Sequence, residues 1–293
     1  MFQGLFFRVL ACSALRQIAG EFGVSHATVQ RHVERLGRHC LLLHEQLRPR
    51  ESPGEPIVLD GLRSFEWAQY WPFDLNLLVG GSHFVYAFND AELRRSGTMT
   101  PTQRTRRQAL ERRFGRPAPQ ATRAAVQELI ARVVAPGRAV TVHSDLQAAY
   151  VQAFRRLPDR RIHHRTTSSR ALRTPRNRLF PANLADLLIR HTGANHKRET
   201  IAFSKRRQGA LYRMAIFAVW RNYVKSTSER RRDEPPGVRI GAIPRRLALP
   251  DVLRARLFPW RTRLGDWLTA CYYGRIPTRC LRQPRSHRLR YAV

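Results

Sequence analysis

Acidic residues are scarce in this sequence, and their scarcity constrains the fold more than any other feature. The 293 residues include 53 Lys and Arg but only 21 Asp and Glu, which leaves a net charge of +32. Charge of one sign resists compaction and favours association with a polyanion. Nucleic acid is the expected partner, because neutralising its phosphates releases counterions. An anionic membrane surface is the alternative, but the sequence has no amphipathic anchor and no long apolar span.

One acid lies in a strongly basic run. Glu199 is the single acid among the cations of residues 194–208, a stretch that predicts the start of a long helix. Apolar residues then recur at helical spacing, at positions 211, 214, 215, 218 and 219, and indicate a helix buried on most sides. The simplest interpretation of Glu199 is a salt bridge that relieves local repulsion.

Two further acids end short apolar segments that predict strands. Residues 54–61 form one segment, stopped by Asp60 and Gly61, and residues 137–145 form another, ended by Asp145. If the strands are neighbours and the helix of Glu199 packs across their edge, three carboxylates converge. Converging carboxylates repel one another unless a cation lies between them. Hard divalent ions such as Mg²⁺ prefer oxygen ligands, and a pair of them supports phosphoryl transfer.

Several short segments together resemble a known protein family: residues 58–61, 65–66 with 69–76, 143–145 and 196–200. In this order they resemble the bacterial insertion-sequence transposases of the DDE type. The resemblance implies a ribonuclease-H-like catalytic domain that cleaves and joins DNA with two divalent ions, Mg²⁺ or Mn²⁺. It assigns the metal-binding, catalytic triad to Asp60, Asp145 and Glu199. It also assigns the basic residue near the cleaved DNA end to Lys205 or Arg206.

Residues 15–36 resemble a helix-turn-helix, the second strong pattern of the sequence. Gly23 lies at the turn, and Ser25 is a good N-cap for the second helix. A recognition helix of this kind enters the major groove. The predicted DNA-binding residues are Ser25, His26, Ala27, Gln30, Arg31, Arg35 and Arg38, of which the last two suit phosphate contacts. The alternative is a helical hairpin that serves packing or dimerisation.

The patterns and the resemblance together predict an α/β fold in three parts. A small all-α helix-turn-helix domain is expected at residues 1–48, and a basic C-terminal extension at 229–293. Between them, residues 56–228 should form a ribonuclease-H-like mixed sheet flanked by helices. Further strands are expected at 75–81, 83–88 and 160–166, and helices at 102–114, 120–134 and 146–157.

Several charged residues have more than one interpretation. Asp90 and Glu92 follow the hairpin and are rival ligands, although acids in turns are usually solvated. Asp186 is the rival for the third carboxylate, since it lies on the amphipathic stretch that precedes Glu199. The arginines of residues 102–114 suit either DNA contact or a solvated helix face.

The expected function is that of a transposase that binds the ends of an insertion sequence and performs metal-dependent strand cleavage and strand transfer. Double-stranded DNA is the expected partner, bound by a homo-oligomer in the bacterial cytoplasm at the nucleoid, with no membrane partner. Four cysteines without a Cys-x-x-Cys pair indicate free thiols in a reducing compartment. The competing hypothesis is an inactive or truncated remnant that only binds DNA.

Overall fold

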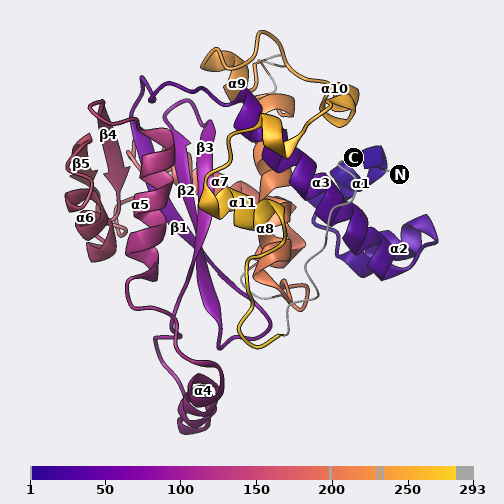
Figure 1. The fold of residues 1–293 in the computed structure, drawn as a ribbon, viewed down its shortest axis with the longest axis vertical. Coiled ribbons are helices and arrows are strands. Elements are labelled where there is room, and N and C mark those ends of the chain that lie inside the picture. The colour runs from indigo at the N-terminus through magenta and orange to yellow at the C-terminus, as the bar shows by residue number, and fades with distance from the viewer. Residues whose placement is uncertain (1, 198–199, 229, 231, 233, 282–293) are drawn as a thin grey trace.

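The computed structural model describes residues 2–197, 200–228, 230, 232 and 234–281 (Figure 1). Its strands are β1 (Ile57–Phe65), β2 (Pro72–Gly80), β3 (Val85–Glu92), β4 (Ala139–Ser144) and β5 (Arg161–Thr166). Its α-helices are α1 (Phe2–Leu10), α2 (Leu15–Phe22), α3 (His26–Leu47), α4 (Pro101–Phe114), α5 (Ala121–Val133), α6 (Ala148–Arg155), α7 (Phe180–Thr192), α8 (Arg207–Val219), α9 (Pro236–Arg239), α10 (Leu249–Arg254) and α11 (Asp266–Tyr272). The predicted α/β class, with a mixed sheet flanked by helices, is confirmed.

The five strands form one sheet in the order β3-β2-β1-β4-β5 (Figure 1). β1 pairs antiparallel with β2, and β2 pairs antiparallel with β3. β1 also pairs in parallel with β4, which in turn pairs in parallel with β5. Parallel neighbours require crossover connections, and α5 and α6 lie in those connections. β1 is therefore the central strand, with neighbours of opposite direction on its two sides.

β1 extends further than its sequence predicted. The prediction that Asp60 and Gly61 end this strand is wrong, because β1 continues to Phe65. Pairing with β2 is unbroken as far as Phe65 opposite Pro72. Those ladder hydrogen bonds satisfy the backbone groups and outweigh the local turn preference of Asp-Gly. Asp60 therefore lies within a strand, where the pleat sets the direction of its side chain.

Helices cover both faces of the sheet (Figure 1). On one face, α5 packs on β3 and against α6, and Tyr150 of α6 approaches Gly61 of β1. Side chains alternate between faces along a strand, so Val58 faces the opposite layer, where it packs against Ala182 of α7. α8 also contacts β3, and α3 packs along α8. The central strand is thus enclosed between two helical layers.

α2 and α3 are joined by a tight turn. Gly23 has a φ of 62°, the left-handed conformation that glycine accepts at a helix end. At the start of α3, Ser25 Oγ accepts a hydrogen bond from the backbone N–H of Thr28 (3.1 Å). α3 then runs for 22 residues, and Cys40 and Leu41 in its second half belong to the same hydrophobic cluster as the sheet. The N-terminal helices are therefore packed onto the α/β layers.

The long helix predicted around Glu199 begins later than expected. α8 starts at Arg207, Ala194–His196 form a short 3-10 turn, and Glu199 lies outside the described residues. The backbone N–H of Arg207 donates to Glu66 Oε2 (3.1 Å) and to Thr278 Oγ1 (3.2 Å). Side chains from distant segments thus satisfy the N-terminus of α8 and set where it begins. The prediction that this helix is buried on most sides is confirmed.

The described part of the predicted C-terminal extension is folded onto the core. Its buried residues include Leu249, Val252, Leu268 and Cys271. The indole Nε1 of Trp267 in α11 donates to Asp90 Oδ1 in β3 (2.8 Å). Segments near the C-terminus therefore complete the layer beside β3 instead of forming an unpacked basic tail.

The close approach of α3 to α8 at Gly37 gives a test of the packing. A Cβ atom at Gly37 would lie 2.4 Å from Tyr212 Cβ and 2.8 Å from Tyr212 Cα. We expect Gly37→Ala to lower the free energy of unfolding, measured in urea, by about 1–3 kcal/mol through overpacking. Gly20 is an exposed glycine within α2, with no atom within 4 Å of an added Cβ. Gly20→Ala should therefore be neutral or stabilise by up to about 1 kcal/mol, and equal losses in the two variants would contradict this contact.

Candidate functional site

β1 and β4 bring Asp60 and Asp145 together. The two strands pair in parallel, with Val58 beside His143. Extending this register by two residues sets Asp60 level with Asp145, which directly follows β4. Residues at the same level of neighbouring strands point to the same face. The structure therefore places side by side the two acids that the sequence analysis selected from its apolar segments.

α7 adds a third carboxylate, that of Asp186. Val58 packs against Leu179 and Ala182 at the start of α7. Asp60 lies two residues beyond Val58 on the same face of β1, and Asp186 lies one helical turn beyond Ala182. The two carboxylates are close enough for the charge of Asp60 to raise the pKa of Asp186. The acid considered as the rival third ligand is therefore a neighbour of Asp60.

Burial and mutual repulsion both oppose ionisation of these carboxyls. The pKa of Asp60 is raised by burial and, beyond that, by the charges of Asp145 and Asp74. The pKa of Asp186 is raised to about 8, chiefly by burial and then by the charge of Asp60. Arg173, an exposed residue of the basic loop before α7, lowers the pKa of both Asp60 and Asp186. Carboxyl groups are therefore crowded here, and Arg173, with Arg190 beside Asp186, only partly offsets the resistance to their ionisation.

A glycine lets a tyrosine approach this group from the other face of the sheet. A Cβ atom at Gly61 would lie 3.1 Å from the Tyr150 hydroxyl oxygen and 3.5 Å from Asp74 Cγ. Burial and the surrounding carboxylates raise the pKa of Tyr150, so its hydroxyl stays protonated. Asp74 has its own cation, since Arg63 donates from Nε to Oδ1 (3.1 Å) and from Nη2 to Oδ2 (3.3 Å). Asp74 therefore adds charge to the site while remaining paired.

The donor set suits a hard divalent cation. Asp60, Asp145 and Asp186 offer only carboxylate oxygens, which Mg²⁺ prefers. Asp186 Oδ1 is buried and has no hydrogen-bond partner, a state that costs free energy unless a proton or a cation compensates it. Among the described residues, no group of three or more His, Cys, Asp or Glu side chains has the arrangement needed to hold a metal ion. These three aspartates are the candidate ligands, and a cation would relieve the repulsion between them.

The remaining predicted catalytic residues lie before α8. Glu199 is outside the described residues, so its role stays a prediction. Lys205 is exposed, and Arg206 is half-buried directly before the first residue of α8. The backbone carbonyl of Ser204 accepts from the N–H of Trp67 (3.1 Å), which attaches this segment to the turn after β1. The predicted basic residues are therefore anchored beyond the end of the strand that carries Asp60.

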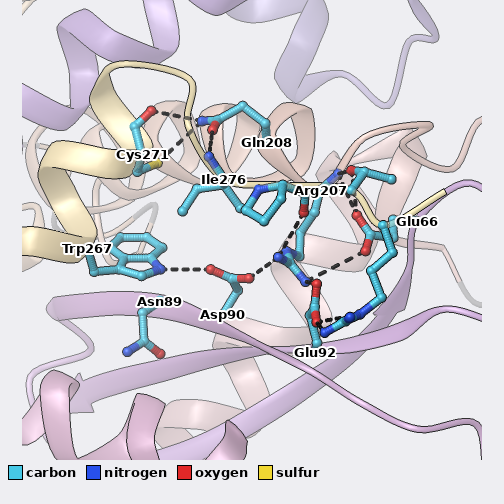
Figure 2. Close-up of polar contacts among 12 residues, drawn as sticks. Glu66, Asn89, Asp90, Glu92, Arg207, Gln208, Trp267, Cys271 and Ile276 are labelled. Atoms are coloured by element: carbon cyan, nitrogen blue, oxygen red, sulfur yellow. Dashed lines mark hydrogen bonds and ion pairs between the residues drawn. The ribbon is translucent and has the colours of Figure 1, made fainter. Parts of the chain in front are cut away.

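A second group of acids surrounds the buried guanidinium of Arg207 (Figure 2). Three carboxylates lie within salt-bridge distance: Asp90 Oδ2 at 2.7 Å from Nε, Glu92 Oε1 at 2.8 Å from Nη1, and Glu66 Oε1 at 3.6 Å from Nη1. Arg279 supplies another cation, with its Nε 2.9 Å from Glu92 Oε2. This group therefore balances three acids with two arginines.

This pairing argues against Asp90 and Glu92 as metal ligands. The solvated position usual for acids after a hairpin is not observed, because β3 extends to Glu92 and leaves the Asp90 side chain only 5% exposed. Burial raises the pKa of Asp90, and the charge of Arg207 opposes that shift. The arginines already compensate these carboxylates. The group around Asp60 is the less compensated of the two and is the better candidate for a cation.

The residues predicted to contact DNA lie mostly on the exposed start of α3 and the turn before it. Five of them are exposed: Ser25, His26, Ala27, Gln30 and Arg31. Arg35 is half-buried, with its guanidinium carbon 5.6 Å from the ring centroid of Phe2. Arg38 is only 9% exposed, because α3 has reached the core at this point. Arg38 is therefore not placed for the phosphate contact predicted for it.

Two residues beside the carboxylates, Asp74 and Tyr150, were not predicted from the sequence. Asp74 lies in a strand that is buried throughout, so no alternation of polar and apolar residues distinguished it. Tyr150 approaches β1 closely at Gly61, which has no Cβ, and nothing in the local sequence indicates that approach. Asp186 lies four residues after the apolar Ala182 on a predicted helix. This spacing places both residues on the same face of the helix.

Comparison with known proteins adds no family assignment to this geometry. No family model matches the sequence, and no curated protein matches it. In the part of the chain that the structure describes, no helix is long and apolar enough to cross a membrane. Function is therefore inferred from the carboxylates and from the charge of the chain.

The raised pKa of Asp186 predicts a dependence of stability on pH. A carboxyl with a pKa of 3.8 when unfolded and about 8 when folded binds more protons in the folded state between these values. The free energy of unfolding should therefore fall as the pH rises from about 4 to about 8, by up to about 1.4 kcal/mol per pH unit. We expect urea denaturation in a metal chelator to give a flatter profile for Asp186→Asn. A profile that this substitution leaves unchanged would contradict the raised pKa.

The cluster around Arg207 gives a second prediction about stability. In Arg207→Met the surrounding acids lose their central cation while remaining buried, so we expect the free energy of unfolding to fall by about 3–5 kcal/mol. Arg245→Met is the control, because Arg245 pairs with Asp251 at 3.2 Å with side chains 69% and 38% exposed. That loss should stay below about 1 kcal/mol. Similar losses in the two variants would show that the buried cluster does not anchor the fold.

Proposed function

We propose that this chain is a transposase of the DDE type with a ribonuclease-H-like catalytic core. It would bind the ends of an insertion sequence and carry out divalent-metal-dependent DNA cleavage and strand transfer. The observation that carries the proposal is the meeting of Asp60 with Asp145 on neighbouring parallel strands, with Asp186 beside them. A sheet of three antiparallel strands continued by two parallel ones supports the proposed fold.

The proposed task of the carboxylates is to hold two divalent ions, Mg²⁺ or Mn²⁺. Such a pair, when bound, activates a water or a 3′-hydroxyl and stabilises the leaving oxygen of a phosphodiester. Asp60 is central to the ligand set, because the charge of Asp145 raises its pKa and its own charge raises the pKa of Asp186. The resemblance assigns the third ligand to Glu199, whereas the described geometry favours Asp186.

The start of α3 is the proposed element that recognises the ends of the insertion sequence. His26, Gln30 and Arg31 are exposed together there, as the base-reading residues of a recognition helix must be. The net charge of +32 favours association with DNA of any sequence. Assembly of several copies on two DNA ends, in the bacterial cytoplasm at the nucleoid, belongs to the proposal through the resemblance.

The test is nicking of a DNA fragment that carries the element's ends, measured with Mg²⁺ and with Mn²⁺. We expect the wild-type protein to nick and Asp60→Asn to lose at least about 100-fold in rate, since one isosteric change removes a shared ligand. DNA affinity should be unchanged in this variant. Comparing Asp186→Asn with Glu199→Gln identifies the third ligand as the position where nicking is lost.

Asp251→Asn is the matched control, because Asp251 is an exposed acid on α10. It should nick as the wild type does. Nicking by Asp60→Asn at the wild-type rate would overturn the carboxylate assignment. Binding of DNA without nicking by the wild type, with either metal, would favour the second candidate, a DNA-binding remnant without catalysis.

A further inference from the structure

α4 stands away from the folded body, between β3 and α5 (Figure 1). Of its 14 residues only Leu110 and Glu111 are buried. Its start is set locally: Thr100 Oγ1 accepts from the Gln103 N–H (3.2 Å), Gln103 Oε1 accepts from the Thr100 N–H (3.1 Å), and Pro101 begins the helix. α4 is therefore a helix that projects from the body of the protein, and local capping contacts set where it begins.

The arginines of α4 and its flanks are divided between an anchored side and an exposed side. Glu111 is the one acid in the helix, and it lies buried among three guanidinium groups: Arg94 Nε at 2.8 Å, Arg116 Nε at 3.0 Å and Arg107 Nε at 3.5 Å. The other sides of the helix carry four more exposed arginines, spread over about half of its circumference: Arg104, Arg106, Arg112 and Arg113. Because the only acid of α4 is used on the anchored side, the exposed cations have no counter-charge within the helix.

The exposed side of α4 is also free of large apolar residues. Its other members are small or polar, among them Thr102, Thr105, Gln108 and Ala109. A helix that lies on a membrane needs an apolar face, and a stable protein interface has an apolar core. Phosphate groups require only positive charge and hydrogen-bond donors, which guanidinium groups supply. Charge complementarity therefore favours a nucleic-acid backbone as the partner of this surface.

We propose that α4 is an arm that contacts the phosphate backbone of duplex DNA, separately from the α2–α3 pair and from the carboxylate site. A helix of this length spans about 20 Å, or about six base pairs, so its arginines reach several successive phosphates. The contact is independent of sequence because it involves no base edges. It rests on the proposed function only in taking DNA as the polyanion, and it requires no cleavage.

The salt dependence of binding tests the arm. One variant replaces the four exposed arginines of α4 with Gln. Its control replaces four other exposed arginines with Gln, so that both lose the same charge: Arg254, Arg256, Arg261 and Arg263. Affinity for a duplex of random sequence is measured in a chelator between about 50 and 200 mM salt, where log Kobs falls linearly with log salt concentration.

We expect the slope of the α4 variant to be smaller in magnitude by about 2–3, at about 0.9 for each lost phosphate contact, because Arg104 and Arg106 cannot both face one DNA backbone. The control should change the slope by less than about 1. A third variant with Lys at the four α4 positions should keep the wild-type slope, because a phosphate contact needs the charge more than the planar guanidinium. Circular dichroism and urea denaturation establish that all three variants are folded.

Equal changes of slope in the α4 variant and in the control would contradict the proposed contact between α4 and DNA, because the net charge of the chain alone would then explain binding. A Lys variant as weak as the Gln variant would also overturn it. The proposal would also be contradicted if the Gln variant of α4 kept the wild-type slope with DNA but lost binding to phosphatidylserine vesicles. That result would indicate a membrane partner. The binding assay contains no divalent ion and therefore does not depend on cleavage. If the chain never nicks DNA but the salt slope still falls only in the α4 variant, the proposed catalytic function is wrong and the proposed role of α4 stands.

Discussion

The buried ion-pair cluster around Arg207 joins segments that are far apart in the sequence. Glu66 comes from the turn after β1, Asp90 and Glu92 from β3, and Thr278 from the C-terminal segment. A buried guanidinium or carboxylate alone would cost several kcal/mol, whereas the group together compensates its charges. The start of α8, the far ends of β1 and β3 and the C-terminal segment therefore depend on one another (Figure 2).

The group of acids around Asp60 is less completely paired with cations. Asp145, directly after β4, and Asp186 of α7 both lie near Asp60 of β1. Beyond the effect of burial, the charge of Asp145 raises the pKa of Asp60, and the charge of Asp60 raises that of Asp186. In a chain with 21 acids against 53 Lys and Arg, placing acids together without full pairing is unfavourable for stability. Such an arrangement is typical of functional sites, where pKa values are perturbed for a reason other than stability. The two clusters thus divide the scarce acids between anchoring the fold and forming the candidate site.

Much of the architecture was predictable, because its signals are local. Apolar runs bounded by turn residues predicted the five strands, and helical spacing predicted most of the helices. Gly23 and Ser25 predicted the turn between α2 and α3, since a left-handed glycine and a capping hydroxyl act on adjacent residues. Asp60 and Asp145 were selected from their positions in apolar segments, and the parallel register sets them level.

The sequence by itself therefore determined the α/β class, the order of most elements and the candidate carboxylates Asp60 and Asp145, with Asp186 as the rival third. Only the tertiary structure decided where β1 ends, where α8 begins and that Arg38 is buried. It also decided that Asp90 pairs with the buried Arg207, whereas burial and the charge of Asp60 raise the pKa of Asp186. These outcomes depend on strand pairing, on helices packed across the sheet, and on charges and hydrogen bonds from distant segments, such as the bond that Thr278 donates to Glu66 across 212 residues. Local periodicity contains no information about such partners, because burial and Coulomb energies depend on distance in space.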